Sequence, residues 1–396
     1  MGVLSSQVQG YLERSSWIRR MFEAGIELKK KHGEAAVCDF SLGNPDLPPP
    51  VAVCQGLRDL AEEAGQPFAF GYMPNFGYPH VRQALAKEVS REQGLEVPPD
   101  CLVITCGAAG AINAFYRAVL EPGDEIICPA PYFVEYGFYV ENHGGVLKPV
   151  ASHPADFSLD LAALEASITP KTRAVLINSP NNPTGRVYTK EELAGLAALL
   201  KKHSAGRPRP IFLLADEPYR FLAFDGAEVP SLLPLYEYTV VVSSFSKNLS
   251  LAGARVGYAL VNPVMPGREE LVSGIILANR ILGFVNAPAL AQKLLLKALG
   301  SQVDVDIYRK RRDCMADVLR DAGYEFAMPK GAFYFFPQAP GGDDVAFCQA
   351  LADELILAVP GRGFGTPGYF RLAFCIGEEV IERARPGFKK ARERFR

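Results

Sequence analysis

Short apolar runs recur through the middle of this chain, and each one leads into a polar or glycine-rich cluster. The five runs are LVIT at 102–105, EIIC at 125–128, AVLIN at 174–178, IFLLA at 211–215 and TVVV at 239–242. A helical pattern at 189–202, with Thr189 as a plausible N-cap, separates two of them. Strands that alternate with helices predict an α/β fold, with a mostly parallel sheet covered by helices on both faces.

The clusters that follow the runs predict a binding crevice. They read TCGAAGA, PAPYF, SPNNPTG, DEPYR and SSFSK in chain order. In open α/β sheets, ligands bind beyond the carboxyl ends of the strands. We therefore expect residues from distant parts of the chain to converge on one crevice at that edge of the sheet.

Lys247 lies just beyond the last of these strands. Ser244 and Ser246 precede it, and Arg255 follows eight residues later. Hydroxyl groups and a guanidinium can hold a phosphate. A neighbouring cation and partial burial lower the pKa of a lysine, which frees its amine to act as a nucleophile. The alternative is an ordinary surface lysine in a polar loop.

A glycine turn follows the first apolar run. It places Gly107, Ala108 and Ala109 at the start of a predicted helix. Free N–H groups and the positive end of the helix dipole make such a start an anion site. The turn is not G-x-G-x-x-G, and no G-x-x-x-x-G-K-[ST] occurs, so dinucleotide-binding and P-loop interpretations lose support.

The remaining clusters supply groups that suit a phosphorylated pyridine bearing an aldehyde. Lys247 can form a Schiff base with the aldehyde, and Asp216 can keep the ring nitrogen protonated. Asn182 and Tyr219 can donate to the phenolic oxygen, and Tyr132 can stack on one ring face. Each residue alone has an ordinary alternative as a cap, a turn residue or a core aromatic, but the ordered set is far more specific than its members.

Three motifs carry a resemblance to a known family. NSPNNPTG at 178–185, DEPYR at 216–220 and SSFSKNLSLAGARVG at 243–257 resemble the class I and II aminotransferases, which are pyridoxal-phosphate enzymes of the aspartate-aminotransferase fold (fold type I). LGNPD, G-Y-x-x-x-x-G, TCGAAGA and YFRLAF also match in the same order, so the resemblance covers nearly the whole chain. It implies a large domain with a seven-stranded sheet and a smaller domain.

The resemblance also implies roles for individual residues. Lys247 would be the Schiff-base lysine that moves the α-proton, Asp216 would pair with the pyridinium nitrogen, and Arg371 would bind the substrate α-carboxylate. Gly43 would lie against the substrate. Tyr72 would reach the phosphate of a neighbouring subunit, so the active unit would be a homodimer.

In the same way, the resemblance implies that Asn182 and Tyr219 contact the ring oxygen and that Asn182 also lies beside the substrate. Tyr132 occupies the ring-stacking position, where some members of the family have tryptophan.

The implied reaction moves an amino group between an L-amino acid and a 2-oxo acid with ping-pong kinetics. Aspartate or glutamate is the first expected donor, and 2-oxoglutarate is the expected acceptor. An acidic substrate needs a second cation. Arg280 lies near the position where acidic-substrate members place an arginine from the other subunit, and an interface arginine is the alternative. Phe76, Phe333 and Tyr334 could instead line an aromatic or aliphatic pocket.

Two other functions remain open at this point. Relatives with this fold also catalyse eliminations, so a pyridoxal-phosphate lyase that breaks C–S bonds is the nearer alternative. A non-enzymatic effector-binding module is more remote, because the chain has no room for a DNA-binding region before residue 40 and no basic balance.

The end of the chain has a different pattern. Helices are expected after Pro288, short strands in AFYFF and GYFRLAFCI, and a last helix from Glu378. We interpret this part, together with the N-terminal helix, as a smaller α+β domain. The expected division is a large domain at 48–285 and a small domain formed by 1–47 and 286–396.

Charge and cysteine content narrow the class of partner and the compartment. The formal net charge of -2 does not favour nucleic acid or an anionic membrane surface. The longest apolar stretch is interrupted by polar residues and proline, so no membrane span is expected. Eight scattered cysteines without a C-x-x-C indicate free thiols in the cytoplasm rather than disulfides or a metal site.

Overall fold

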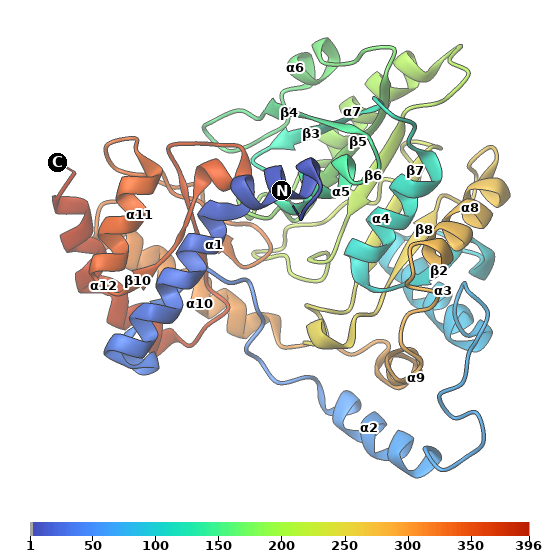
Figure 1. Cartoon of the computed structure of the whole chain (residues 1–396), viewed down its shortest axis with the longest axis horizontal. Coiled ribbons are helices and arrows are strands. Elements are labelled where there is room, and N and C mark those ends of the chain that lie inside the picture. Colours follow the sequence, from blue (N-terminus) through green and yellow to red (C-terminus); the bar gives the residue numbers. More distant parts are fainter. Residues whose placement is uncertain (1–2, 396) are drawn as a thin grey trace.

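A seven-stranded sheet forms the centre of the molecule, in the order β2-β8-β7-β6-β5-β3-β4 (Figure 1). The computed structural model describes residues 3–395, without the side chains of residues 14–22 and 24. The strands are β2 (Leu102–Thr105), β3 (Glu125–Ala130), β4 (Val146–Ala151), β5 (Thr172–Asn178), β6 (Phe212–Asp216), β7 (Thr239–Ser244) and β8 (Gly257–Val261). β8 is antiparallel to both of its neighbours, and the other pairs are parallel. The predicted α/β fold with a mostly parallel sheet is confirmed.

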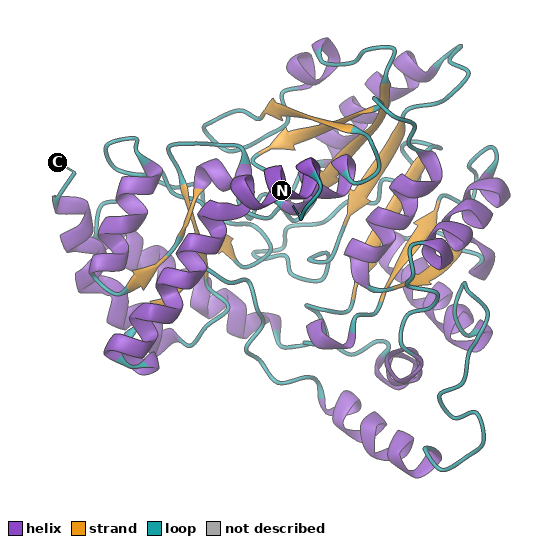
Figure 2. Ribbon diagram, viewed as in Figure 1, coloured by secondary structure: helices purple, strands orange, loops and turns teal. Residues whose placement is uncertain are grey.

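Helices lie on both faces of this sheet (Figure 2). They are α3 (Pro79–Gln93), α4 (Gly107–Val119), α5 (Glu135–Glu141), α6 (Leu161–Ala166), α7 (Lys190–Ser204), α8 (Arg268–Ile281) and α9 (Ala289–Ala298). Helix α2 (Val51–Glu63) lies apart from the sheet and packs against α9 (Figure 1). Leu213 and Ala215 of β6 pack in an apolar cluster with α3 and α7. Phe212 and Leu214 pack in a second cluster with α4 and α8. Because both faces are buried, the central strands are continuous apolar runs in the sequence.

Strands β4 and β8 were not predicted. β4 is an edge strand that pairs only with β3, and its Lys148 and Pro149 break the apolar pattern. Edge positions tolerate such residues because one side of the strand carries no ladder. β8 starts at Gly257, directly after the polar segment that holds Lys247 and Arg255, so it lacks the turn-bounded apolar pattern of its neighbours.

The rest of the chain forms a second group of helices around two small sheets, on the left in Figure 1. Its helices are α1 (Ser6–His32), α10 (Val305–Asp321), α11 (Asp344–Asp353) and α12 (Glu378–Glu393), and its strands are β1 (Cys38–Asp39), β9 (Tyr334–Phe335), β10 (Ile356–Leu357), β11 (Val359–Pro360) and β12 (Phe370–Ala373). β1 pairs with β10, and β11, β12 and β9 form a three-stranded sheet. Tyr308, Phe335, Phe347 and Phe388 share its apolar core, which is distinct from the clusters of the large sheet.

The packing of α9 bears on where the two domains divide. Ala291, Leu294 and Leu295 of α9 belong to the apolar cluster of the large sheet. A boundary after residue 285 would separate α9 from that cluster. We therefore propose that the large domain runs from residue 48 to near Gly300, and that the small domain begins after it.

Two segments connect the parts of the molecule. Residues 40–50 cross between them in extended conformation without helix or strand. Helix α1 begins beside α5, where Tyr11 packs edge-on against Phe138, and ends beside the small sheets, where Lys29 pairs with Asp39 at 2.6 Å. Among the described residues, no helix is long and apolar enough to cross a membrane.

Candidate active site

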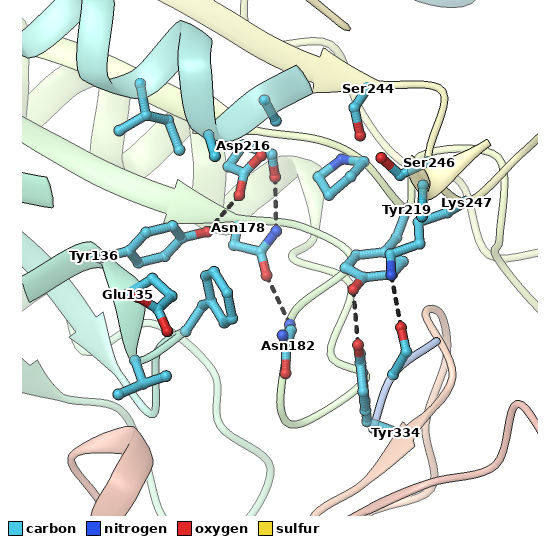
Figure 3. A pocket seen from close by; sticks show the side chains of 18 of the residues that line it. Glu135, Tyr136, Asn178, Asn182, Asp216, Tyr219, Ser244, Ser246, Lys247 and Tyr334 are labelled. Carbon is cyan, nitrogen blue, oxygen red and sulfur yellow. Dashed lines mark hydrogen bonds between the residues drawn. The ribbon is translucent and has the colours of Figure 1, made fainter. Parts of the chain in front are cut away.

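A cavity of about 400 Å³ opens at the carboxyl ends of β5, β6 and β7, where the large sheet faces β9 and β12 (Figure 3). Most of the expected site residues line it, namely Gly43, Ala108, Ala109, Asn182, Asp216, Tyr219, Ser244, Ser246, Lys247, Arg255 and Arg371. They come from six separate segments of the chain. Their convergence follows from the parallel strands, whose carboxyl ends meet at one edge of the sheet.

Lys247 lies in the segment that follows β7. Its Nζ donates to the backbone carbonyl of Gly43 at 2.6 Å. Burial lowers the pKa of Lys247 to about 8, and the nearby Arg371 and Arg255 add to this effect, while Cys375 opposes it. A lysine with this pKa has a substantial neutral fraction near pH 8, so its amine is available as a nucleophile or a base.

Asp216 is the last residue of β6, and it is buried. Its Oδ2 accepts a hydrogen bond from the Tyr136 hydroxyl at 2.6 Å, whereas its Oδ1 has no partner among the described residues. Burial raises the pKa of Asp216 to about 7, and the hydrogen bond from Tyr136 opposes the shift. An unpartnered buried carboxylate oxygen is costly, and a cationic N–H donor in the cavity would satisfy it.

Two asparagines connect β5 to this carboxylate. Asn178 donates from Nδ2 to the backbone carbonyl of Asp216 at 2.7 Å, and its Oδ1 accepts from the backbone N–H of Asn182 at 2.7 Å. The Asn182 side chain is thereby held at the cavity wall. Its Oδ1 accepts from Arg371 Nη1 at 3.1 Å.

Arg371 is a buried cation on β12. Its Nη2 donates to the backbone carbonyl of Ser41 at 2.5 Å, while its Nε has no partner among the described residues. The guanidinium lies close to two aromatic rings, 4.9 Å from the centroid of Tyr334 and 4.7 Å from that of Phe364. Burial lowers the pKa of Arg371, but arginine stays protonated in proteins. The site therefore holds a permanent positive charge with a free donor.

The glycine turn and Arg255 form the other end of the cavity. Gly107 has φ +72°, and a Cβ at this position would lie 2.9 Å from Arg255 Nη2. Glycine is thus required for the arginine to approach the start of α4. Ala108 and Ala109 line the cavity from that helix, and Ser244 and Ser246 line it from the end of β7. Backbone N–H groups, hydroxyls and a guanidinium are the groups that bind a phosphate.

The structure places the expected ring-stacking residue outside the cavity lining. Tyr132 does not line the cavity, and its ring instead fills the space beside Gly365, where a Cβ would lie 2.6 Å from it. The next residue, Phe133, lines the cavity. The segment is extended before α5, so neighbouring side chains point to opposite sides. We therefore transfer the proposed stacking role from Tyr132 to Phe133.

Two other expected residues lie away from this cavity. Tyr72 is 97% exposed and lines a separate shallow hollow with Phe284. Arg280 is exposed near the end of α8. Both were predicted to act from a neighbouring subunit, so their distance from the cavity of their own chain leaves those roles as predictions.

Several cavity residues were missed. Tyr136 supports Asp216, Asn178 positions Asn182, and Phe364 packs on Arg371. Tyr334 was considered only as a pocket aromatic, but its hydroxyl lies 2.8 Å from the Tyr219 hydroxyl. Asn178 could have been found, because it ends a predicted strand; the other three carry no local pattern that separates them from core aromatics.

These residues fit pyridoxal phosphate, the cofactor that the sequence motifs imply. The free Oδ1 of Asp216 suits a protonated ring nitrogen, Phe133 offers an apolar ring face, and the cup around Arg255 suits a phosphate. Lys247 supplies the amine. The cofactor would supply an aldehyde and an electron-poor ring, which side chains alone lack.

Comparisons with known proteins agree. The family model for aminotransferase class I and II matches residues 35–386. The probable aspartate/prephenate aminotransferase of Thermus aquaticus is 33% identical, over 92% of this chain and 94% of its own length. The aspartate aminotransferase of Thermotoga maritima is 34% identical, over 89% of this chain and 90% of its own length.

Solved structures show the same likeness. A crystal structure of an amino transferase from Eubacterium rectale has a TM-score of 0.95 and 38% identity, with 100% of both chains covered. Aspartate aminotransferase of Thermus thermophilus with maleate has a TM-score of 0.87 and 30% identity, covering 99% of this chain and 100% of the other. The chain belongs to the class I and II aminotransferases, which use pyridoxal phosphate.

Proposed function

We propose that this enzyme transfers an amino group between an L-amino acid and a 2-oxo acid in two half-reactions at this cavity. One observation carries the proposal. A single cavity contains an amine of lowered pKa, a buried carboxylate oxygen without a partner and a buried guanidinium with a free donor. The amine can react with the substrate, the carboxylate can pair with a protonated pyridine nitrogen, and the guanidinium can pair with the α-carboxylate of an amino acid.

Lys247 is proposed as the base and acid of the reaction. When bound, pyridoxal phosphate supplies an aldehyde that holds the amino group and a ring that accepts an electron pair. In the first half-reaction, the neutral Nζ of Lys247 takes the proton from the substrate α-carbon. In the reverse half-reaction, the protonated Nζ returns a proton to that carbon. Its lowered pKa suits both tasks near neutral pH, because the amine can exist in either form.

Asp216 is proposed to keep the ring nitrogen protonated. Its Oδ1 would gain a charged hydrogen-bond partner there, and Tyr136 holds the carboxylate in the required orientation through Oδ2. Tyr219 and Asn182 are proposed donors to the ring oxygen, and Phe133 packs against one ring face. Ala108, Ala109, Ser244, Ser246 and Arg255, with the turn at Gly107, are proposed to bind the phosphate.

Arg371 is proposed to bind the α-carboxylate. Asn182 and Ser41 hold two of its nitrogens, so the guanidinium is oriented before substrate arrives. Its Nε, buried beside Tyr334 and Phe364 and without a partner among the described residues, is a desolvated donor for an anion. Gly43 lines the same cavity and has no side chain that would exclude the substrate.

Aspartate or glutamate is the proposed donor, with 2-oxoglutarate as acceptor, and the names of the relatives support an acidic donor. Among the described residues, the cavity wall contains no lysine or arginine beyond Lys247, Arg255 and Arg371, and it includes the carboxyl group of Glu135. An acidic side chain would therefore need a cation from a second copy of the chain. Arg280 is the proposed source.

A homodimer is proposed on the same grounds. The chain exposes five large apolar side chains, Phe68, Phe70, Leu277, Ile281 and Phe284. Exposed apolar residues of this size usually occur singly, and several together mark an interaction surface. Tyr72 lies among the same segments and is proposed to reach the phosphate of the partner's cofactor. Eight unpaired cysteines support a reducing compartment, and we propose the cytoplasm.

The test is a two-stage absorbance titration of purified protein loaded with pyridoxal phosphate. Aspartate or glutamate should abolish the absorbance band of the loaded enzyme, and 2-oxoglutarate should restore it. Release of pyruvate and ammonia from a cysteine-like substrate would indicate a lyase instead. Failure to bind pyridoxal phosphate would overturn the proposed function.

The proposed role of Arg280 has a separate test. Arg280→Ala should raise KM for aspartate and leave KM for an uncharged amino acid unchanged. Arg320→Ala, on an exposed part of α10, is the matched control. Equal KM values for aspartate in wild type and Arg280→Ala would remove Arg280 from the site.

A further inference from the structure

Tyr334 contacts three parts of the cavity, but only its contact with Arg371 enters the mechanism described so far. It is the first residue of β9 and is only 2% exposed. The ring of Tyr334 faces Arg371. Its hydroxyl faces Tyr219 and also packs against the backbone of Gly43. Figure 3 shows its hydroxyl directed at Tyr219.

The ring of Tyr334 holds one face of the Arg371 guanidinium. The distance from the guanidinium carbon to the ring centroid of Tyr334 is 4.9 Å, and the distance from the same carbon to the ring centroid of Phe364 is 4.7 Å. A cation close to two aromatic rings is stabilised by both ring quadrupoles. The rings and the hydrogen bonds of Nη1 and Nη2 together position the guanidinium, whose Nε has no partner among the described residues.

The hydroxyl of Tyr334 orients the hydroxyl of Tyr219. The two oxygens are 2.8 Å apart, and both residues are buried. A tyrosine hydroxyl carries one proton, so only one of the pair can donate to the other. If Tyr219 donates to an oxygen of the cofactor ring, Tyr334 must donate to Tyr219. That direction polarises the Tyr219 O–H bond and strengthens its donation.

The tip of Tyr334 also fixes the crossover segment. A Cβ on Gly43 would lie 2.0 Å from the Tyr334 oxygen, so the backbone of this segment packs directly against the hydroxyl. The carbonyl of Gly43 accepts the hydrogen bond from Lys247. Tyr334 thus contacts Arg371 and Tyr219 directly and reaches Lys247 through the backbone of Gly43.

We propose that Tyr334 is a positioning residue that couples the guanidinium binding the substrate carboxylate to the hydroxyl donating to the cofactor ring oxygen. This inference rests on the proposed function. The two contacts use different parts of one side chain, so two substitutions separate them. Tyr334→Phe removes the hydroxyl and keeps the ring, whereas Tyr334→Leu removes both.

The experiment uses holoenzyme and apoenzyme of wild type and both variants. The dissociation constant of pyridoxal phosphate and the pH midpoint of its absorbance change are measured by titration. In Tyr334→Phe, we expect the dissociation constant to rise about 2- to 10-fold, the range for one lost hydrogen bond. The midpoint should rise, because a ring oxygen with a weaker donor holds a proton more tightly. KM for the amino donor should stay within twofold of wild type.

Tyr334→Leu should show the same effects on the cofactor and, in addition, raise KM by about 10-fold, because the guanidinium loses one aromatic face. Tyr236→Phe is the matched control. Tyr236 is a buried tyrosine whose hydroxyl donates to the carbonyl of Ile211 at the opposite end of β6, and its loss should leave the dissociation constant, the midpoint and KM unchanged.

Wild-type cofactor binding and midpoint in Tyr334→Phe would overturn the inference, as would equal shifts in Tyr236→Phe. If Tyr334→Leu does not fold, Tyr334→Phe alone still decides the role of the hydroxyl. Failure of the wild type to bind pyridoxal phosphate would instead overturn the proposed function.

Discussion

The cavity has two walls, which are held in place by different forces. The first, here called the sheet wall, consists of Asn182, Asp216 and Lys247 and follows strands whose backbones pair on both sides. The second, here called the β12 wall, consists of Tyr334, Phe364 and Arg371. Its strands are short, and its central arginine is held by aromatic stacking and two hydrogen bonds. The sheet wall carries the ionisable groups proposed for bond making, and the β12 wall carries the arginine proposed for substrate binding.

This comparison predicts that loss of an ionisable group from the sheet wall lowers kcat, whereas loss of the Arg371 guanidinium, or of an aromatic ring beside it, raises KM. Substitutions can test this prediction through kcat and KM. Loss of a group that acts in bond making destabilises the transition state alone, whereas loss of a binding group destabilises both the bound substrate and the transition state.

The largest expected effect is that of Lys247→Ala. The variant should lose at least about 10⁴-fold in kcat, because both proton transfers lose their acid–base group. It should also lose the absorbance band of the loaded enzyme, while its melting temperature stays near that of wild type. Transamination within tenfold of wild type would refute the proposed role of Lys247.

The second effect concerns the β12 wall. Arg371→Lys keeps the charge but loses the planar fork, so KM for the amino donor should rise about 10- to 100-fold. Affinity for pyridoxal phosphate should change little. A fall in kcat with unchanged KM would contradict the division between the two walls.

A smaller effect should distinguish two adjacent aromatic residues. Phe133→Leu should weaken pyridoxal phosphate binding by about 3- to 10-fold through loss of ring stacking. Tyr132→Leu, the matched control, should leave cofactor binding unchanged, because Tyr132 faces Gly365. Dissociation constants from fluorescence titration provide the measurement, and the opposite ranking would restore Tyr132 to the stacking position.

The smallest expected effect is on the stability of the apoprotein. Burial raises the pKa of Asp216 from 3.8 to about 7, so between these pH values the native state binds more protons than the unfolded state. Stability should therefore fall as pH rises from 4 to 7. Asp216→Asn should remove part of this fall, as measured by urea unfolding at pH 5 and pH 7.5. An identical pH dependence in both proteins would show that Asp216 is ionised before the cofactor binds.

Lys247 acts in a separate pH range. Its pKa is lowered to about 8 from 10.5, so its contribution to stability rises with pH only above 8. The rate at which apoprotein captures pyridoxal phosphate should rise to a plateau above pH 8, because the neutral amine is the reactive form.

The sheet wall was largely predictable from the sequence, because its residues follow apolar runs that report strand ends directly. Asn182, Asp216 and Lys247 each follow such a run. Other features were not predictable, for identifiable reasons. Which side chain of the segment at Tyr132 faces the cavity depends on the local backbone of an irregular segment, which no periodicity fixes. The edge strand β4 carries Lys148 and Pro149, so it lacks an apolar signal.

The β12 wall was predictable only through one motif. Arg371 was found by resemblance, but Tyr334 and Phe364 are aromatic residues among many in that part of the chain. Their proximity to Arg371 depends on the register of β9 with β12, where Tyr334 lies opposite Ala373. Pairing between strands that are distant in sequence leaves no trace in local composition.

The unpartnered atoms of the cavity, Asp216 Oδ1 and Arg371 Nε, have a consequence for the life of the protein in a cell. Each lowers the stability of the empty chain, and a ligand that satisfies Asp216 binds only the folded state. Binding at 100 times the dissociation constant adds about 2.7 kcal/mol of stability. Newly made chains without cofactor are therefore unfolded more often and are degraded sooner. The abundance of the enzyme would then follow the supply of vitamin B6.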